Sequence, residues 1–150
     1  MAEGDGDVYN NYFEQVMKGE FNLGSGGDDI KVILVHGHTP NLDTHDEYAD
    51  VSGDEYGTAL GYTAGGKSLV SQDVVQDDAN DRGVFDADNP VWAALGVLSP
   101  AAPSHAIMYD NTHASDLLML IWVLGTTETN GGDYGLQWGA DGITLMAKAV

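Results

Sequence analysis

The segment Ile30–His36 (IKVILVH) is the stretch that most directly decides the fold class of this chain. It is rich in β-branched residues and follows a flexible glycine-rich turn, Gly24–Asp29 (GSGGDD), so it predicts a buried β-strand. Two later apolar runs, Ala106–Tyr109 (AIMY) and Leu117–Leu124 (LLMLIWVL), predict further core strands. These three runs place a β-sheet at the centre of the protein.

Shorter strand signals surround these core runs. Ser68–Val75 and Arg82–Asp86 are expected to pair, and Tyr134–Trp138 and Gly142–Met146 are expected to form two more short strands. Between the last core run and these strands, Asn130–Asp133 (NGGD) predicts a tight hairpin turn.

Only Val8–Phe21 (VYNNYFEQVMKGEF) carries apolar residues at helical spacing, and the helix is expected to end at Gly19. The elements together predict a mainly β fold, a sandwich or barrel of short antiparallel strands with one N-terminal helix. Residues 8–150 are expected to form one domain, preceded by a flexible acidic stretch over residues 1–7.

The charge of the chain is extreme: 24 acidic residues face 5 basic ones, which gives a formal net charge of -19. The hydrophobic fraction of 43% is that of an ordinary folded domain, so the acidity does not indicate disorder. Such a surface repels itself at low ionic strength, and screening by salt relieves the repulsion. The composition therefore predicts a folded protein that works in a very salty medium.

The same composition excludes several classes of function. Phosphate backbones are bound by Lys and Arg, so this surface is not expected to contact DNA or RNA directly. The longest apolar run is far shorter than the roughly 20 residues that cross a membrane. The chain has no cysteine, which excludes disulfides and thiolate metal sites.

Gly61–Ser68 (GYTAGGKS) matches the phosphate-binding pattern G-x-x-x-x-G-K-[ST] letter for letter. That pattern requires a buried strand before the loop and a helix after it, so that N–H groups and the helix dipole converge on phosphate. Neither element is predicted here. A nucleotide-binding protein is therefore kept as an alternative, and a glycine-rich turn with Lys67 exposed is the preferred interpretation.

Two groups of residues are candidate cation ligands. His36 and His38 lie two apart in an extended segment, so their imidazoles could share one face and chelate an ion, with His45 near in sequence. This spacing is weakly specific, and polar histidines at the end of a strand are the preferred interpretation. The densest carboxylate cluster suits hard cations such as Na⁺, K⁺, Mg²⁺ or Ca²⁺, bound weakly, although a solvated acidic face is the commoner outcome for such a cluster. Its members are Asp77, Asp78, Asp81, Asp86 and Asp88.

No enzyme signature is evident. One segment gathers serine, histidine and aspartate, but closeness in sequence does not orient a nucleophile against a base. Its residues are Ser104, His105, Asp110, His113, Ser115 and Asp116. A non-enzymatic role without a resident cofactor is expected.

Several segments taken in order are more specific together than each is alone. They run from VYNNYFEQVMKGEFNL and DDIKVILV through HTPNLDTHDEYADV, GYTAGGKSL, DDANDRGVFDADNPVWAAL and AIMYDNT to GGDYGLQWGADGITLM. This succession resembles a family of small structural proteins of tailed bacterial and archaeal viruses. Members from ordinary environments are less acidic, so the bias here resembles that of a virus of halophilic archaea.

The resemblance implies a virion component that decorates or stabilises the capsid, with a tail or connector protein as the alternative. It implies a homo-oligomer, such as a trimer, whose partners are copies of itself and the major capsid protein, assembled in the host cytoplasm. No catalytic residue is implied. The GYTAGGKS string then becomes a YTAGG turn of the family, extended by Lys67 and Ser68.

Overall fold

The computed structural model describes residues 4–147, with side chains placed as far as Ile143. The described residues form ten strands, one α-helix and two short 3-10 helices. They are β1 (Gly6–Val8), α1 (Asn10–Lys18), β2 (Ile30–Val35), η1 (Tyr48–Asp50), η2 (Ser52–Asp54), β3 (Lys67–Ser68), β4 (Asp73–Asp77), β5 (Arg82–Asp86), β6 (Val91–Trp92), β7 (His105–Asp110), β8 (Leu118–Val123), β9 (Tyr134–Gly135) and β10 (Thr144–Ala147). The prediction of a mainly β fold with one N-terminal helix is confirmed.

The three apolar runs do form the centre of the largest sheet, whose strand order is β1-β8-β7-β2-β3 with every pair antiparallel. The register sets Ile33 of β2 opposite Ile107 of β7, and Ile107 opposite Ile121 of β8. All three isoleucines are fully buried. This row of branched side chains fixes the pairing, because a slip by one residue would move each of them to the other face.

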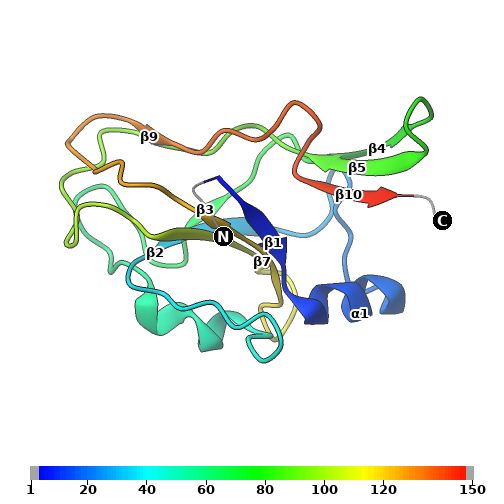
Figure 1. Cartoon of the computed structure of the whole chain (residues 1–150), viewed down its shortest axis with the longest axis horizontal. Helices are drawn as coiled ribbons and strands as arrows, with labels where there is room; N and C mark the ends of the chain where they lie inside the picture. The colour runs from blue at the N-terminus through cyan, green and yellow to red at the C-terminus, as the bar shows by residue number, and fades with distance from the viewer. Residues whose placement is uncertain (1–3, 148–150) are drawn as a thin grey trace.

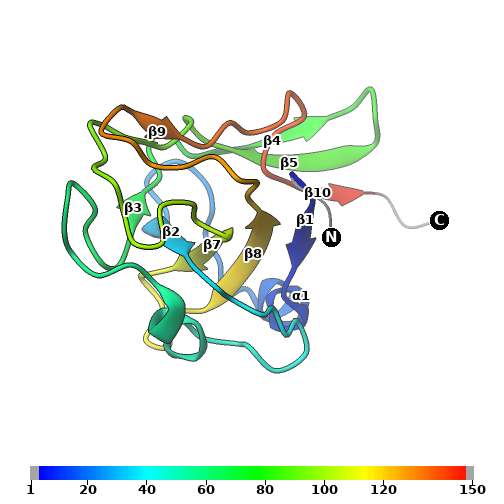
Figure 2. The same ribbon diagram turned by 60° about the vertical axis from the view of Figure 1, so that its left-hand side comes forward.

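Both faces of this sheet are covered, as Figures 1 and 2 show. The hairpin β4–β5, with β10 beside it, and the pair β6–β9 lie on one side, whereas the two 3-10 helices lie on the other. Tyr12 of α1 belongs to the same buried cluster as Phe85 of β5. Val32 and Leu34 belong to one buried cluster, and Ile33 and Val35 to a second one. Burial on both faces explains why β2 is apolar at every position from Val32 to Val35 instead of alternating.

The helix α1 is short and ends where predicted. Gly19 closes it in the left-handed conformation with φ 79°, and its N–H donates to the Val16 carbonyl at 3.0 Å. Tyr12 is buried and packs against Phe21, with ring centroids 5.0 Å apart. The helix is therefore held by aromatic packing rather than by its own nine residues.

The segment Ser68–Val75 is divided between two sheets. Ser68 belongs to β3, which pairs with β2, whereas Asp73–Asp77 forms β4 and pairs with β5. The expected partnership with Arg82–Asp86 is thus correct only for the later residues.

The hairpin predicted at Asn130–Asp133 is wrong. The N–H of Gly131 donates to the Leu95 carbonyl at 2.8 Å, and the N–H of Leu95 donates to the Gly132 carbonyl at 2.9 Å. The following strand β9 pairs with β6 and not with β8. Packing of fully buried Leu95 against this turn outweighs the local preference for a hairpin.

The first strand begins inside the stretch that was expected to be flexible. Gly6–Val8 pairs with β8, and the N–H of Val123 donates to the Asp5 carbonyl at 2.9 Å. Residues 1–3 of that stretch lie outside the described residues. No helix in the described part of the chain is long and apolar enough to cross a membrane.

Candidate functional sites

Three histidines from separate parts of the chain meet at one end of the central sheet. His38 lies three residues after β2, His45 lies in the loop that follows, and His105 opens β7 opposite Val35. The ring centroid of His38 is 5.5 Å from that of His45 and 5.8 Å from that of His105. We call these three residues the histidine cluster.

His38 is the most enclosed member, with only 6% of its surface exposed. Its Nδ1 lies 2.7 Å from Oδ2 of Asp54, so the ring proton sits on Nδ1 and is donated to the carboxylate. Asp54 is held in turn, because its carbonyl accepts from the N–H of His36 at 2.9 Å. The other ring nitrogen of His38, Nε2, is buried without a hydrogen-bond partner.

His105 is fixed in the same tautomer by a different partner. Oγ of Ser104 donates its single proton to the Val35 carbonyl at 3.2 Å and lies 3.0 Å from Nδ1 of His105. Nδ1 of His105 must therefore donate, which leaves Nε2 as a free base. Burial, and then the neighbouring His38, lower the pKa of His105. The neutral imidazole is thus the favoured form.

The structure groups His38 with His45 and His105 and sets His36 elsewhere. Gly37 has φ 59°, which ends the extended geometry that would have put His36 and His38 on one face. The ring of His36 packs on Tyr56, with centroids 4.9 Å apart. His105 was missed because it is 67 positions away in sequence from His38 and joins it only through the β2–β7 pairing.

The five carboxylates of the predicted cation cluster do not lie together. Three of them are at the turn of the β4–β5 hairpin, and two are at the far end of β5, about 13 Å along the strand. Asp77 accepts from Nε of Arg82 at 2.7 Å, and hydrogen bonds from Asn80 and Arg82 lower its pKa. Oδ2 of Asp88 accepts from the Ser71 hydroxyl at 2.7 Å. The turn group is Asp77, Asp78 and Asp81, and the far group is Asp86 and Asp88.

The loop Gly61–Ser68 donates hydrogen bonds from its N–H groups to acceptors within the protein. The N–H of Gly65 and the hydroxyl of Tyr62 both donate to Oε1 of Glu55, at 2.8 and 2.7 Å. The N–H of Ala64 donates to Oγ1 of Thr58 at 2.9 Å. A carboxylate thus sits where a phosphate would have to bind, and β3, not a helix, follows the loop. Both facts argue against nucleotide binding.

The serine, histidine and aspartate residues of the segment after Pro103 are used locally. Asp110 is buried, and its Oδ1 accepts from the N–H groups of Thr112 and His113 at 2.7 and 3.3 Å. Burial raises the pKa of Asp110. The N–H of Ser115 donates to Nδ1 of His113 at 3.1 Å. These contacts shape a turn between β7 and β8. Ser104 and His105 do lie side by side, but the Ser104 hydroxyl donates its proton to the Val35 carbonyl and not to the imidazole.

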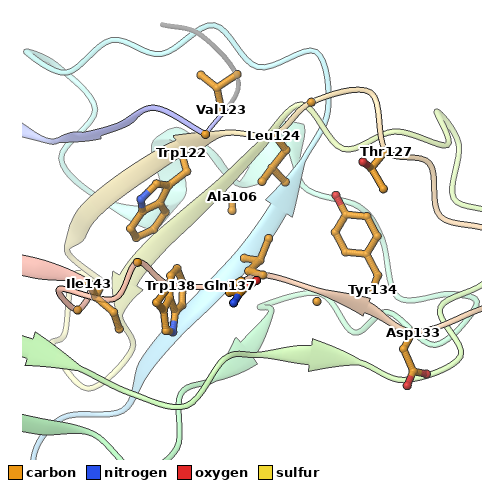
Figure 3. A pocket seen from close by; sticks show the side chains of 16 residues that line it. Ala106, Trp122, Val123, Leu124, Thr127, Asp133, Tyr134, Gln137, Trp138 and Ile143 are labelled. Atoms are coloured by element: carbon orange, nitrogen blue, oxygen red, sulfur yellow. The ribbon is translucent and has the colours of Figure 1, made fainter.

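An open cleft of about 480 Å³ lies between β8 and the segment around β9. Figure 3 shows its floor, where Trp122 from β8 and Trp138 lie against each other, with ring centroids 5.2 Å apart. Tyr134 and Ile143 line the two ends, and Asp133 lies at the rim. Paired indoles in an open cleft can hold an apolar or aromatic group of a partner.

Among the described residues, no group of three or more histidine, aspartate or glutamate side chains is placed so that it could hold a metal ion. Comparisons with models of protein families, with curated proteins and with solved structures found no match to this chain.

Proposed function

We propose that this protein is a structural component of a virion and decorates the head shell in many copies. The observation that carries the proposal is that segments resembling the viral family hold the fold together through internal hydrogen bonds. A structural protein requires this of its characteristic residues.

The first example is the YTAGG turn. Glu55 accepts from Tyr62, Gly65 and Tyr48, and the hydroxyl of Tyr109 donates to the Gly65 carbonyl at 2.8 Å. The turn therefore anchors the long loop before β3 to the central sheet.

The second example is a clasp around Arg82. Its Nε donates to Asp77 at 2.7 Å, and its terminal nitrogen donates to Oδ1 of Asp141 at 2.9 Å. Asp141 lies in the turn that leads into β10. One guanidinium thus joins two turns that are 59 positions apart, and both belong to segments that resemble the viral family.

A contact face of suitable chemistry lies between α1 and the β4–β5 hairpin. An apolar groove of about 470 Å³ there is lined by Tyr12, Val16, Phe21, Leu23, Val74 and Phe85, among others. Phe13 and Met17 of α1 are 49% and 81% exposed beside it. Exposed apolar groups on so acidic a chain favour contacts with the major capsid protein or with other copies.

The net charge sets a condition on such assembly. Copies that each carry -19 repel one another, and salt or bound cations offset the repulsion. We therefore expect a homo-oligomer, such as a trimer, that dissociates on dilution into low salt.

Quantitative mass spectrometry of purified virions tests the proposal. A copy number comparable to that of the major capsid protein supports a head decoration protein. A few copies per particle would indicate a tail or connector protein instead of a head decoration protein. Absence of the protein from particles would overturn the proposal of a virion role. Light scattering from molar to millimolar salt tests the assembly claim separately, because an unchanged oligomer would contradict only that claim.

A further inference from the structure

We propose that the cleft between β8 and β9 binds an extended segment of another protein, which adds a strand along residues 135–137 and stacks an arginine side chain on Trp122 and Trp138. The proposal goes beyond the virion role and does not depend on it. It rests on three features of the cleft, namely a free strand edge, a pair of partly exposed indoles and the charge of the chain.

One edge of the segment around β9 is already paired. The N–H of Leu136 donates to the Pro90 carbonyl at 3.0 Å. The N–H of Trp138 donates to Oδ1 of Asn89 at 2.8 Å. Alternate N–H groups of this extended segment are therefore used on the side of β6 and the residues before it.

The opposite edge faces the cleft. Backbone groups of neighbouring residues point to opposite sides of an extended chain, so those of Gly135 and Gln137 point away from β6. Both residues are exposed and line the cleft. No loop or turn hydrogen bond in the described part of the chain reaches their N–H or carbonyl groups. They present donors and acceptors at a repeat of about 7 Å, with which an added strand can pair.

This edge lacks the devices that usually block strand addition. Exposed edges are commonly protected by charged side chains or proline. The edge strand β4 of the three-stranded sheet, for example, begins and ends with aspartate. The seven residues from Tyr134 to Ala140 (YGLQWGA) contain neither a charge nor a proline, in a chain with 24 acidic residues. The uncharged edge therefore favours pairing with a partner strand.

The fold holds the two indoles beside this edge in place (Figure 3). Nε1 of Trp138 donates to the Asp88 carbonyl at 3.3 Å. Trp122 lies against Gly6, where an added Cβ would be 2.5 Å from Nε1 of the indole. The ring centroids are 5.2 Å apart with a tilt of 44°, and both residues are partly exposed. Two fixed aromatic faces in one cleft can receive a flat side chain by stacking.

The charge of the chain decides which side chain these faces receive. Indoles hold apolar groups and cations alike, and tryptophan is the best aromatic partner for a cation. The net charge of -19 and the exposed Asp133 at the rim favour a cationic group over a neutral or acidic one. Guanidinium is planar and more weakly hydrated than ammonium, so arginine suits the stacked position better than lysine.

A second copy of this chain does not supply that arginine. The only arginine of the sequence, Arg82, already donates to Asp77 and Asp141. Each further copy would also bring the same net charge of -19 to the contact. The partner is therefore a different protein with a basic extended segment.

The test uses the full-length chain in about 1 M KCl, which screens diffuse attraction between a peptide and the carboxylates. The probes are acetylated and amidated pentapeptides, Thr-Val-X-Val-Thr, with arginine, lysine, leucine or glutamate at X. The arginine peptide is expected to bind saturably and to shift the backbone amide signals of Gly135 and Gln137 and the indole signals of Trp122 and Trp138 in nitrogen NMR. The lysine and leucine peptides should bind roughly threefold more weakly, and the glutamate peptide roughly tenfold more weakly.

A pair of variants separates backbone pairing from side-chain contacts. Gln137→Pro removes the outward N–H and should weaken binding of the arginine peptide roughly tenfold. Gln137→Ala keeps that N–H and is the matched control, with an affinity expected within about twofold of the wild-type protein. An arginine peptide with every backbone nitrogen methylated tests the same pairing without any change in the protein, and it is expected not to bind.

Equal affinity for the arginine and glutamate peptides, or equal affinity of the methylated and unmethylated arginine peptides, would overturn the proposal. So would the absence of saturable binding by all four peptides, or shifts confined to residues outside the cleft. Neutral sugars are the other ligands that tryptophan faces can hold, and maltotriose is titrated for this reason. Saturable indole shifts with maltotriose but with none of the peptides would overturn the proposal in favour of a saccharide site.

Discussion

Asp73 of β4 and Asp86 of β5 lie directly opposite each other in the antiparallel register, and both are exposed. Each carboxylate accepts from the N–H of the next residue, Val74 or Ala87, at 2.9 Å. Like charges at opposed positions destabilise a strand pair. This hairpin therefore contains a local form of the repulsion that the whole surface shows.

Asp73→Asn is expected to raise the free energy of unfolding by about 0.5 kcal/mol at low salt, because the amide oxygen keeps the local hydrogen bond and the repulsion disappears. The gain should vanish in about 1 M KCl. Urea unfolding at both salt concentrations measures it. In a double-mutant cycle, adding Asp86→Asn should give little further gain, and fully additive effects would argue against a pairwise repulsion.

Glu55→Gln is expected to lower the free energy of unfolding by about 2 kcal/mol, because the carboxylate accepts from Tyr48, Tyr62 and Gly65 and an amide cannot accept all three bonds. Denaturant unfolding checks this value. The exposed loop residue Glu128 provides the matched control, since Glu128→Gln removes the same charge and should change stability by less than about 0.5 kcal/mol.

Gly66→Ala should cost roughly 2–4 kcal/mol, because the residue has φ 75° and an added Cβ would lie 2.2 Å from the Val32 carbonyl oxygen. Gly65→Ala is the control. It has φ 90°, but the closest atom to its Cβ would be 3.8 Å away, so only backbone strain of about 1 kcal/mol is expected. Similar losses in both variants, measured by thermal unfolding, would contradict a steric role for Gly66.

Alkaline pH is expected to unfold the protein cooperatively. Burial raises the pKa of Tyr56 to about 12 and raises the pKa values of Tyr9, Tyr48, Tyr62 and Tyr109 as well. The unfolded chain ionises near the ordinary tyrosine value of about 10. The stabilising contribution is complete below that pH and is lost as pH rises through the folded-state values.

Tyrosinate absorbance and circular dichroism, recorded together against pH, check this prediction. The two signals should change in one transition above pH 10, since the buried rings ionise only when the fold opens. Ionisation of all tyrosines near pH 10 with an unchanged dichroism spectrum would show that the rings are accessible in the folded state.

Local signals predicted the elements whose cause is local. The helix Asn10–Lys18 stops at Gly19, and Ile30–Val35 is a strand rich in β-branched residues. The pairing of β9 with β6 could not be predicted, because it depends on the contact of Leu95 with a distant turn. The stability of a short strand comes mostly from its packing against other elements, and a local sequence pattern does not encode that packing.

The same limit applies to the candidate sites. The carboxylates from Asp77 to Asp88 are close in sequence, but an extended strand separates them in space. His38 and His105 are far apart in sequence, and adjacent strands bring them together. In a β protein, sequence distance is a poor guide to spatial distance, so a His-x-His pattern identified His38 but not its neighbours.

The contacts along β2 have a consequence for solubility. The strand β3 pairs with only two residues of β2, yet the N–H of Leu34 donates to the hydroxyl of Tyr62 at 3.0 Å and the Leu34 carbonyl accepts from Tyr56. A phenol thus occupies a position at which another polypeptide could add a strand. Unprotected strand edges nucleate aggregation. The loop that carries Tyr56 and Tyr62 therefore protects the edge of β2 against fibrous self-association.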